Sequence, residues 1–147
     1  TNTLILITDT NWIFFYSKNA ITFFFENIKK QGLSFDKKAF KWATIGEGTA
    51  KRLWEYDIKA DFIGNGNPNE TAFQFLKKAK KQTVTFPRAT ISQKSIQKIL
   101  TNQIQAVDLL VYKNQPILNI ESRNEAFLVF TSPMNAAAYF EKNHLKN

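Results

Sequence analysis

Short apolar runs alternate along this chain with segments of helical period, and this alternation constrains the fold more than any other feature. The runs have the length of strands and are Leu4–Ile7, Trp12–Tyr16, Lys41–Ile45, Asp61–Ile63, Val84–Phe86, Val107–Tyr112 and Phe127–Phe130. Several of them are apolar at successive positions and do not alternate with polar residues. Such runs are expected for parallel strands that are covered by helices on both faces of a sheet.

The segments between the runs carry apolar side chains at three- and four-residue spacing. The first stripe is formed by Ile21, Phe24, Phe25 and Ile28, with Asn19 available as its cap. Similar stripes follow Thr49, Asn69 and Ser92. Strands that alternate with helices predict βαβ units with right-handed crossovers, and therefore a doubly wound, flavodoxin-like α/β fold. The pattern does not give the order of the strands in the sheet.

Four loops follow the predicted strands and combine small or hydroxyl residues with the amides of a helix start. They read "YSKNA", "GEGTA", "GNGNPNE" and "PRATISQ". In open α/β sheets, ligands bind beyond the carboxyl ends of the strands. Amides at helix starts hold anionic groups well, so these loops predict an anion-binding edge.

The residue inventory excludes several kinds of chemistry. The 147 residues, enough for one domain or for one domain and part of another, include no cysteine, and the single histidine is His144. Disulfides and thiolate sites are thereby excluded, and a Ser-His-Asp triad is disfavoured. In "GEGTAK" the third glycine of a dinucleotide fingerprint would fall at Lys51, and no P-loop is present. An enzyme with this inventory would work by holding a reactive substrate through amides and hydroxyls.

The net charge of +8 is compatible with an anionic partner, such as a nucleic acid, an acidic membrane surface or a polycarboxylate. Only Arg52, Arg88 and Arg123 are arginines, however, and a protein that reads nucleic acid usually relies on arginine. Many lysines fall in pairs typical of solvated helix faces. No apolar run approaches the roughly 18–20 residues of a membrane span. We expect no signal peptide, no membrane segment and a cytoplasmic protein.

One strand–turn–helix pattern occurs twice. The segments "WIFFYSKNAITFFFE" (12–26) and "LVFTSPMNAAAYFE" (128–141) both read as an apolar run, a hydroxyl residue, Asn-Ala, an aromatic pair and Glu. Ser17 and Ser132 hold equivalent places and are interpreted either as helix caps or ST-turns, or as parts of two ligand loops.

Five segments, taken in order, resemble the uroporphyrinogen-III synthase family: "WIFFYSKNAITFFFE", "WATIGEGTAKRL", "TFPRATIS", "LLVYKNQP" and "LVFTSPMNAAAYF". The resemblance implies two flavodoxin-like lobes joined by a two-stranded linker, with one lobe inserted as a continuous block into the other. It predicts the complete inserted lobe at 9–113, a linker strand at 1–8, and part of the other lobe at 114–147. The family is longer than this chain, which we interpret as the larger part of such a protein.

The resemblance also implies an activity. The reaction is cyclisation of hydroxymethylbilane to uroporphyrinogen III, with inversion of ring D and loss of water, in tetrapyrrole biosynthesis. The family uses no metal or organic cofactor. The partner would be a small-molecule polycarboxylate substrate, with no nucleic acid and no membrane, and we expect a monomer.

Candidate site residues come from the same resemblance. Tyr112 in "VYKNQP" matches a tyrosine proposed to assist departure of the substrate hydroxyl, with a strand tyrosine that packs half-buried as the alternative. Arg88 either pairs with a carboxylate or caps the carbonyls at the end of its strand. The remaining matches lie in loops that face substrate carboxylates in the family, and they are Ser17, Lys18, Asn19, Gly48, Thr49, Ser132, Pro133 and Met134. Lys18 stands where the family commonly has proline.

Two alternatives remain beside the synthase. One is a non-enzymatic basic α/β module that binds nucleic acid or another polyanion. The other is a sensor that binds a tetrapyrrole without converting it.

Overall fold

The computed structural model describes residues 7–115, 127–130 and 133–141. The chain divides into two compact units, Thr1–Lys113 and Asn114–Asn147, and each forms its own set of contacts. Most of the predicted linker strand at 1–8 lies outside the described residues. Ile7, the last residue of its apolar run, is buried in the core of the first unit.

The first unit is built on a sheet of five parallel strands. In chain order they are β1 (Trp12–Phe15), β2 (Lys41–Thr44), β3 (Phe62–Ile63), β4 (Thr83–Ala89) and β5 (Gln105–Tyr112). The sheet order is β3-β2-β1-β4-β5. The predicted parallel α/β sheet is confirmed, but its order differs from the flavodoxin order 2-1-3-4-5. The winding reverses between β1 and β4, which makes this pair the topological switch point.

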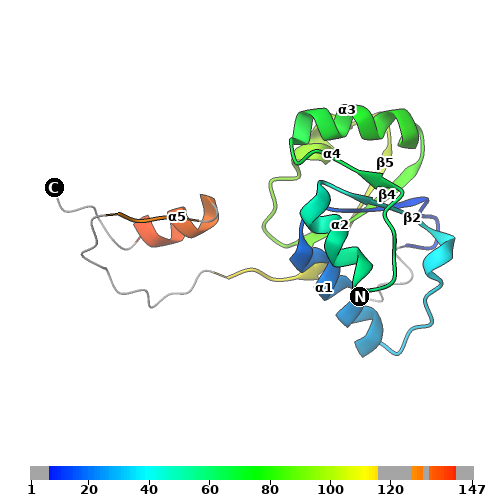
Figure 1. Cartoon of the computed structure of the whole chain (residues 1–147), viewed down its shortest axis with the longest axis horizontal. Coiled ribbons are helices and arrows are strands. Elements are labelled where there is room, and N and C mark those ends of the chain that lie inside the picture. Colours follow the sequence, from blue (N-terminus) through cyan, green and yellow to red (C-terminus); the bar gives the residue numbers. More distant parts are fainter. Residues whose placement is uncertain (1–6, 116–126, 131–132, 142–147) are drawn as a thin grey trace. The chain divides into compact units, whose positions relative to one another are not determined.

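Helices cover both faces of the sheet, and Figure 1 shows the three layers in the part of the chain from blue to yellow. The helices α1 (Lys18–Lys30) and α2 (Glu47–Trp54) pack on one face, and α3 (Pro68–Ala79) and α4 (Ser95–Ile99) pack on the other. Alternate residues of β1 serve the two cores: Ile13 and Phe15 face α1, whereas Trp12 and Phe14 face α3. This double burial explains why the strand is apolar at every position.

Three helices, α1, α2 and α3, begin earlier than their apolar stripes predicted. The cap of α1 is Ser17, whose Oγ accepts a hydrogen bond of 3.2 Å from the backbone N–H of Ala20, and Asn19 lies inside the first turn. Likewise α2 and α3 begin before Thr49 and Asn69, with Gly46 and Asn67 as their caps, whereas α4 begins after Ser92, with Lys94 as its cap. The reason is physical: an apolar stripe marks the buried turns, whereas the cap is set by the geometry of the loop that enters the helix.

The second unit contains α5 (Pro133–Phe140), as the repeated pattern predicted. The strand predicted at Phe127–Phe130 is not formed, since no ladder pairs these residues, and Phe127 and Val129 are 90% and 89% exposed. A strand requires a neighbour for its backbone groups, and the described residues of this unit offer none.

Candidate functional site

The loops that follow β1, β2 and β3 are held side by side at the carboxyl edge of the sheet. The N–H of Ile45 donates to the carbonyl of Phe15 (3.1 Å), and the N–H of Gly66 donates to the carbonyl of Ile45 (2.8 Å). A third bond of 2.9 Å joins the N–H of Gly64 to the carbonyl of Thr44. These bonds place the starts of α1, α2 and α3 along one edge, as the loop sequences predicted.

Gly64 makes this close approach possible. A Cβ at this position would lie 2.4 Å from the side chain of Thr71 in α3 and 2.6 Å from the backbone carbonyl oxygen of Ile45. Both separations are shorter than real Cβ contacts, so only glycine fits between the loop and the helix.

The predicted residues around the starts of α1 and α2 lie close together. A Cβ on Gly48 would be 3.8 Å from Cε of Lys18, so the lysine side chain passes over the start of α2. Lys18 and Asn19 are exposed in the first turn of α1, and Gly48 is exposed in the first turn of α2. Thr49 is only 7% exposed, so its side chain packs inside the unit.

Arg88, near the end of β4, forms a two-point salt bridge with Asp108 of β5. Its Nε donates to Oδ1 (2.8 Å) and its Nη2 donates to Oδ2 (2.9 Å). Its Nη1 donates to the carbonyls of Ala89 (2.8 Å) and Thr90 (3.3 Å), so the guanidinium caps strand-end carbonyls. Each of its nitrogens therefore already binds a protein oxygen.

Asp108 collects further donors from the segment that leads into α4. The Nζ of Lys94 lies 2.5 Å from Oδ2, and the Nε2 of Gln97 donates to Oδ1 at 2.8 Å. Hydrogen bonds from Arg88, supported by those from Lys94 and Gln97, hold the pKa of Asp108 well below its usual range despite partial burial. The same bonds to Asp108 raise the pKa of Arg88.

Tyr16 connects this group to β1. Its phenol oxygen accepts a hydrogen bond of 3.2 Å from the backbone N–H of Gln97, and burial raises the pKa of the phenol, so it stays neutral. We call Tyr16, Arg88, Lys94, Gln97 and Asp108 the switch-point cluster, because the group joins the ends of β1 and β4. Sequence reasoning missed four of these five. The available signal was one carboxylate, Asp108, inside an otherwise apolar strand.

Tyr112, the predicted catalytic residue, lies at the end of β5 on the opposite face of the sheet. It is half-buried, and its ring stacks on that of Phe23 in α1, with centroids 4.8 Å apart and planes at 23°. Asn27 of α1 also donates from Nδ2 to the carbonyl of Val111 (2.8 Å). The end of β5 is thus fastened to α1, while Arg88 and the switch-point cluster lie on the α4 side.

The predicted loop of the second unit is described in part. Ser132 lies outside the described residues, and Pro133 begins α5. Met134 is 42% exposed, and its Sδ accepts a hydrogen bond of 3.4 Å from Nδ2 of Asn114. That this loop faces the loop of Ser17 stays a prediction.

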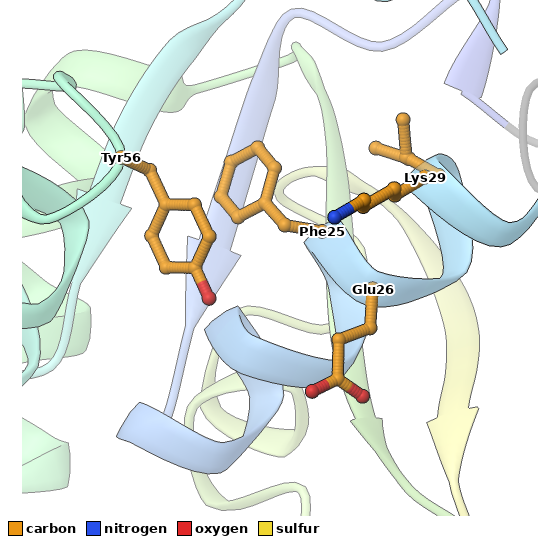
Figure 2. Close-up of a pocket in the computed structure, with 5 residues that line it drawn as sticks. Phe25, Glu26, Lys29 and Tyr56 are labelled. Carbon is orange, nitrogen blue, oxygen red and sulfur yellow. The ribbon is translucent and has the colours of Figure 1, made fainter. Parts of the chain in front are cut away.

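A hollow of about 430 Å³ lies along the second half of α1, away from the loops (Figure 2). It is lined by Phe25, Glu26, Ile28, Lys29 and Tyr56. The rings of Phe25 and Tyr56 stack with centroids 4.3 Å apart, and Figure 2 shows them facing each other. None of the predicted site residues lines this hollow, so it is separate from the candidate site.

The described residues contain no group of three or more histidine, aspartate or glutamate side chains able to hold a metal ion. Within the same residues, no helix combines the length and hydropathy that a bilayer span requires. The fold and the edge together define a doubly wound α/β protein whose helix starts converge on one candidate anion site.

The family follows from comparison with known sequences. The family described as "Uroporphyrinogen-III synthase HemD" matches residues 2–144, and the chain belongs to this family. A search of curated proteins gave no match.

Solved structures share the fold. Uroporphyrinogen-III synthetase from Helicobacter pylori superposes with a TM-score of 0.68 at 22% identity, over 95% of this chain and 66% of that one. Uroporphyrinogen III synthase from the extremely thermophilic bacterium Thermus thermophilus gives a TM-score of 0.59 at 14% identity, over 76% of this chain and 44% of that one. The chain therefore spans less than two thirds of the length of these proteins.

Proposed function

We propose that this chain takes part in uroporphyrinogen-III synthesis, by cyclising hydroxymethylbilane with inversion of ring D and loss of water. The observation that supports this most strongly is the family match, because it runs over residues 2–144. The converging loops at the carboxyl edge add a physical reason, since amides at helix starts suit the carboxylates of a tetrapyrrole. No cofactor is part of the proposal.

We further propose the two-lobed arrangement for the whole protein. Residues 9–113 would form the inserted flavodoxin-like lobe, 1–8 a linker strand, and 114–147 part of the other lobe. The division of the chain after Lys113 supports this, as does the helix that follows the second copy of the strand–turn–helix pattern. A monomeric, cytoplasmic enzyme acting on a small molecule completes the proposal.

The proposed reaction requires few reactive side chains. The substrate loses its own hydroxyl to form a stabilised cation, so the protein has to orient the chain and to prevent closure without ring inversion. Substrate carboxylates would bind the amides at the starts of α1 and α2 and the ammonium group of Lys18. The Oγ of Ser17 accepts from Ala20, and its O–H hydrogen can donate to a carboxylate.

Tyr112 is proposed to donate a hydrogen bond or a proton to the departing hydroxyl. The stacking of its ring on Phe23 supports this role, because the contact fixes where the phenol points. Tyr112→Phe keeps the stacked ring and removes the hydroxyl. We expect turnover to fall about tenfold or more with an unchanged melting temperature.

The matched control is Tyr56→Phe, because Tyr56 also stacks on a phenylalanine but lies at the separate hollow. We expect normal turnover from this control. If Tyr112→Phe turned over as fast as the control, Tyr112 would have no part in the mechanism.

The deciding experiment supplies hydroxymethylbilane to the protein in its natural full length and separates the type I and type III isomers of the product. We expect the type III isomer. Exclusive formation of the type I isomer, the product of uncatalysed closure, would refute the proposed activity.

The two alternatives make different predictions, the first in the isomer assay and the second in a binding assay. A tetrapyrrole sensor would bind the substrate and leave only the type I isomer. A nucleic-acid module would bind nucleic acid, with an affinity that falls steeply as the salt concentration rises. Contacts within the protein disfavour the latter, since Arg52 is held by Glu55 and Thr22, and Arg88 by Asp108.

A further inference from the structure

We infer that Lys94 binds a carboxylate of the substrate, and that its ammonium group gives up its contact with Asp108 to do so. The inference rests on the proposed function, because it adds a residue to the same site. It reassigns to Lys94 the carboxylate-binding role that sequence resemblance had suggested for Arg88.

The first argument is charge. The switch-point cluster sets two cations, Arg88 and Lys94, against one carboxylate, Asp108. One positive charge is therefore in excess. It lies at the end of the sheet where doubly wound proteins bind ligands.

The second argument identifies which cation is available. Arg88 is held by two bonds to Asp108 and by two backbone carbonyls, and its side chain is only 10% exposed. Lys94 makes one contact with Asp108, and its side chain is 37% exposed. Its ammonium group is a point charge on a flexible stem, so it can turn from Asp108 to an incoming carboxylate. Asp108 keeps its bonds from Arg88 and Gln97 during this exchange.

The third argument is the backbone of Lys94. Its φ of 51° and ψ of 35° lie in the left-handed region, which a residue other than glycine seldom adopts. Three residues later the N–H of Gln97 binds Tyr16, which directly precedes the cap of α1. The segment is thus held against the loop after β1 although glycine would suit position 94 better. Lys81 shares the left-handed backbone, so the feature that distinguishes Lys94 is the bond from Gln97 to Tyr16, which holds its segment against the loop after β1.

The test measures binding of uroporphyrin III, a stable polycarboxylate, by fluorescence titration of the natural full-length protein. We expect Lys94→Gln to weaken binding about tenfold or more, because it removes one charge-assisted contact. The salt dependence of binding should fall as well. The control is Lys98→Gln, an exposed lysine on the same helix, which should change affinity by less than about twofold.

Lys94→Gly separates the charge from the fold. Glycine relieves the left-handed backbone, so we expect this variant to lose affinity as Lys94→Gln does while its melting temperature stays the same or rises. A purely structural lysine would give the reverse result, with lower stability and unchanged affinity. Equal affinity of wild type and Lys94→Gln would overturn the inference, and so would the absence of binding by the wild type.

The isomer assay keeps the two proposals apart. If the wild type makes the type III isomer and Lys94→Gln binds uroporphyrin III normally, the inference about Lys94 fails alone. If the wild type makes only the type I isomer but both Lys94 variants lose affinity, the carboxylate site stands and the proposed activity fails.

Discussion

The two edges of the first unit's sheet use basic residues in different ways. At the carboxyl edge Arg88 and Lys94 share Asp108, and Lys18 passes over Gly48. At the amino edge, where helices end and strands begin, lysines are numerous and mostly exposed: Lys29, Lys30, Lys37, Lys38, Lys41, Lys59, Lys77, Lys78, Lys80 and Lys81. Most of the excess positive charge of the described residues thus lies away from the candidate site.

Helix geometry explains this distribution. Lys29 and Lys30 occupy the last turn of α1, and Lys77 and Lys78 that of α3, where cations complement the helix dipole. Two hollows of about 320 Å³ each lie at this edge, and exposed lysines line both together with Asp61. The comparison teaches that the net charge is a poor guide to the ligand site, whereas the contacts at each edge are a good one.

The largest expected effect tests how closely the carboxyl edge is packed. Gly64→Ala inserts a Cβ against Thr71 and the backbone of Ile45, so we expect a loss of about 3 kcal/mol in the free energy of unfolding. Urea denaturation would measure it. The amino-edge comparison is Gly32→Ala, where φ is +61° but the space is open, so about 1 kcal/mol is expected. Equal losses of stability at Gly64 and Gly32 would contradict the view that the carboxyl edge is the more closely packed of the two.

The next effect concerns the Arg88–Asp108 pair. Asp108→Asn leaves Arg88 without its partner, and we expect a loss of about 2–3 kcal/mol at pH 7, below the value for fully buried pairs because Asp108 is 31% exposed. Asp61→Asn at the amino edge, where the carboxylate accepts from the N–H of Trp42, should cost about 1 kcal/mol. Urea denaturation at pH 7 would measure both, and a larger loss at Asp61 would reverse the comparison.

The pair also predicts a dependence on pH. The pKa of Asp108 is lower in the folded than in the unfolded state. Its stabilising contribution is therefore complete above the unfolded value of about 4, and it is lost as the pH falls below that value toward the folded pKa. Between about pH 6 and pH 3 the wild type should lose more stability than Asp108→Asn. Parallel stability curves for the two proteins would show that the pair is not linked to pH.

A smaller effect is expected at the cap of α1. Ser17→Ala removes the acceptor for the N–H of Ala20 and should cost about 1 kcal/mol in thermal unfolding. Ser17→Gly should cost only a few tenths of about 1 kcal/mol, because glycine tolerates the cap position. If the alanine and glycine variants were equally stable, the cap bond would contribute nothing measurable.

The smallest effect belongs to the amino edge. The double variant Lys29→Gln, Lys30→Gln weakens the interaction with the α1 dipole, and we expect a loss of about 0.5 kcal/mol. Its affinity for uroporphyrin III should match that of the wild type at physiological salt. The two lysines lie at the opposite edge of the sheet from the candidate site, and salt screens exposed charges that are far from a ligand. A loss of affinity as large as that of Lys94→Gln would show that the amino edge takes part in binding.

Sequence reasoning predicted the elements of the first unit well because they depend on neighbours a few residues away. The stripes of α1 and α3 and the apolar run of β1 each reflect local periodicity. The same reasoning misplaced the helix starts and predicted a strand at Phe127–Phe130, since apolar character alone does not supply a pairing partner. For Arg88 both alternatives were open, and the contacts with Ala89 and Thr90 show that it caps carbonyls.

The sequence by itself determined the α/β class, the parallel strands, the loops at their carboxyl ends and the family. These follow from the spacing of apolar residues at two to four positions and from short sequence motifs. Both can be read along the chain and do not depend on how the helices and strands pack. Only the tertiary structure decided the order β3-β2-β1-β4-β5, the pairing of Arg88 with Asp108, and the edge at which most lysines lie. Each of these depends on contacts between residues far apart in the chain, which are set by strand pairing and helix packing and leave no local periodicity behind.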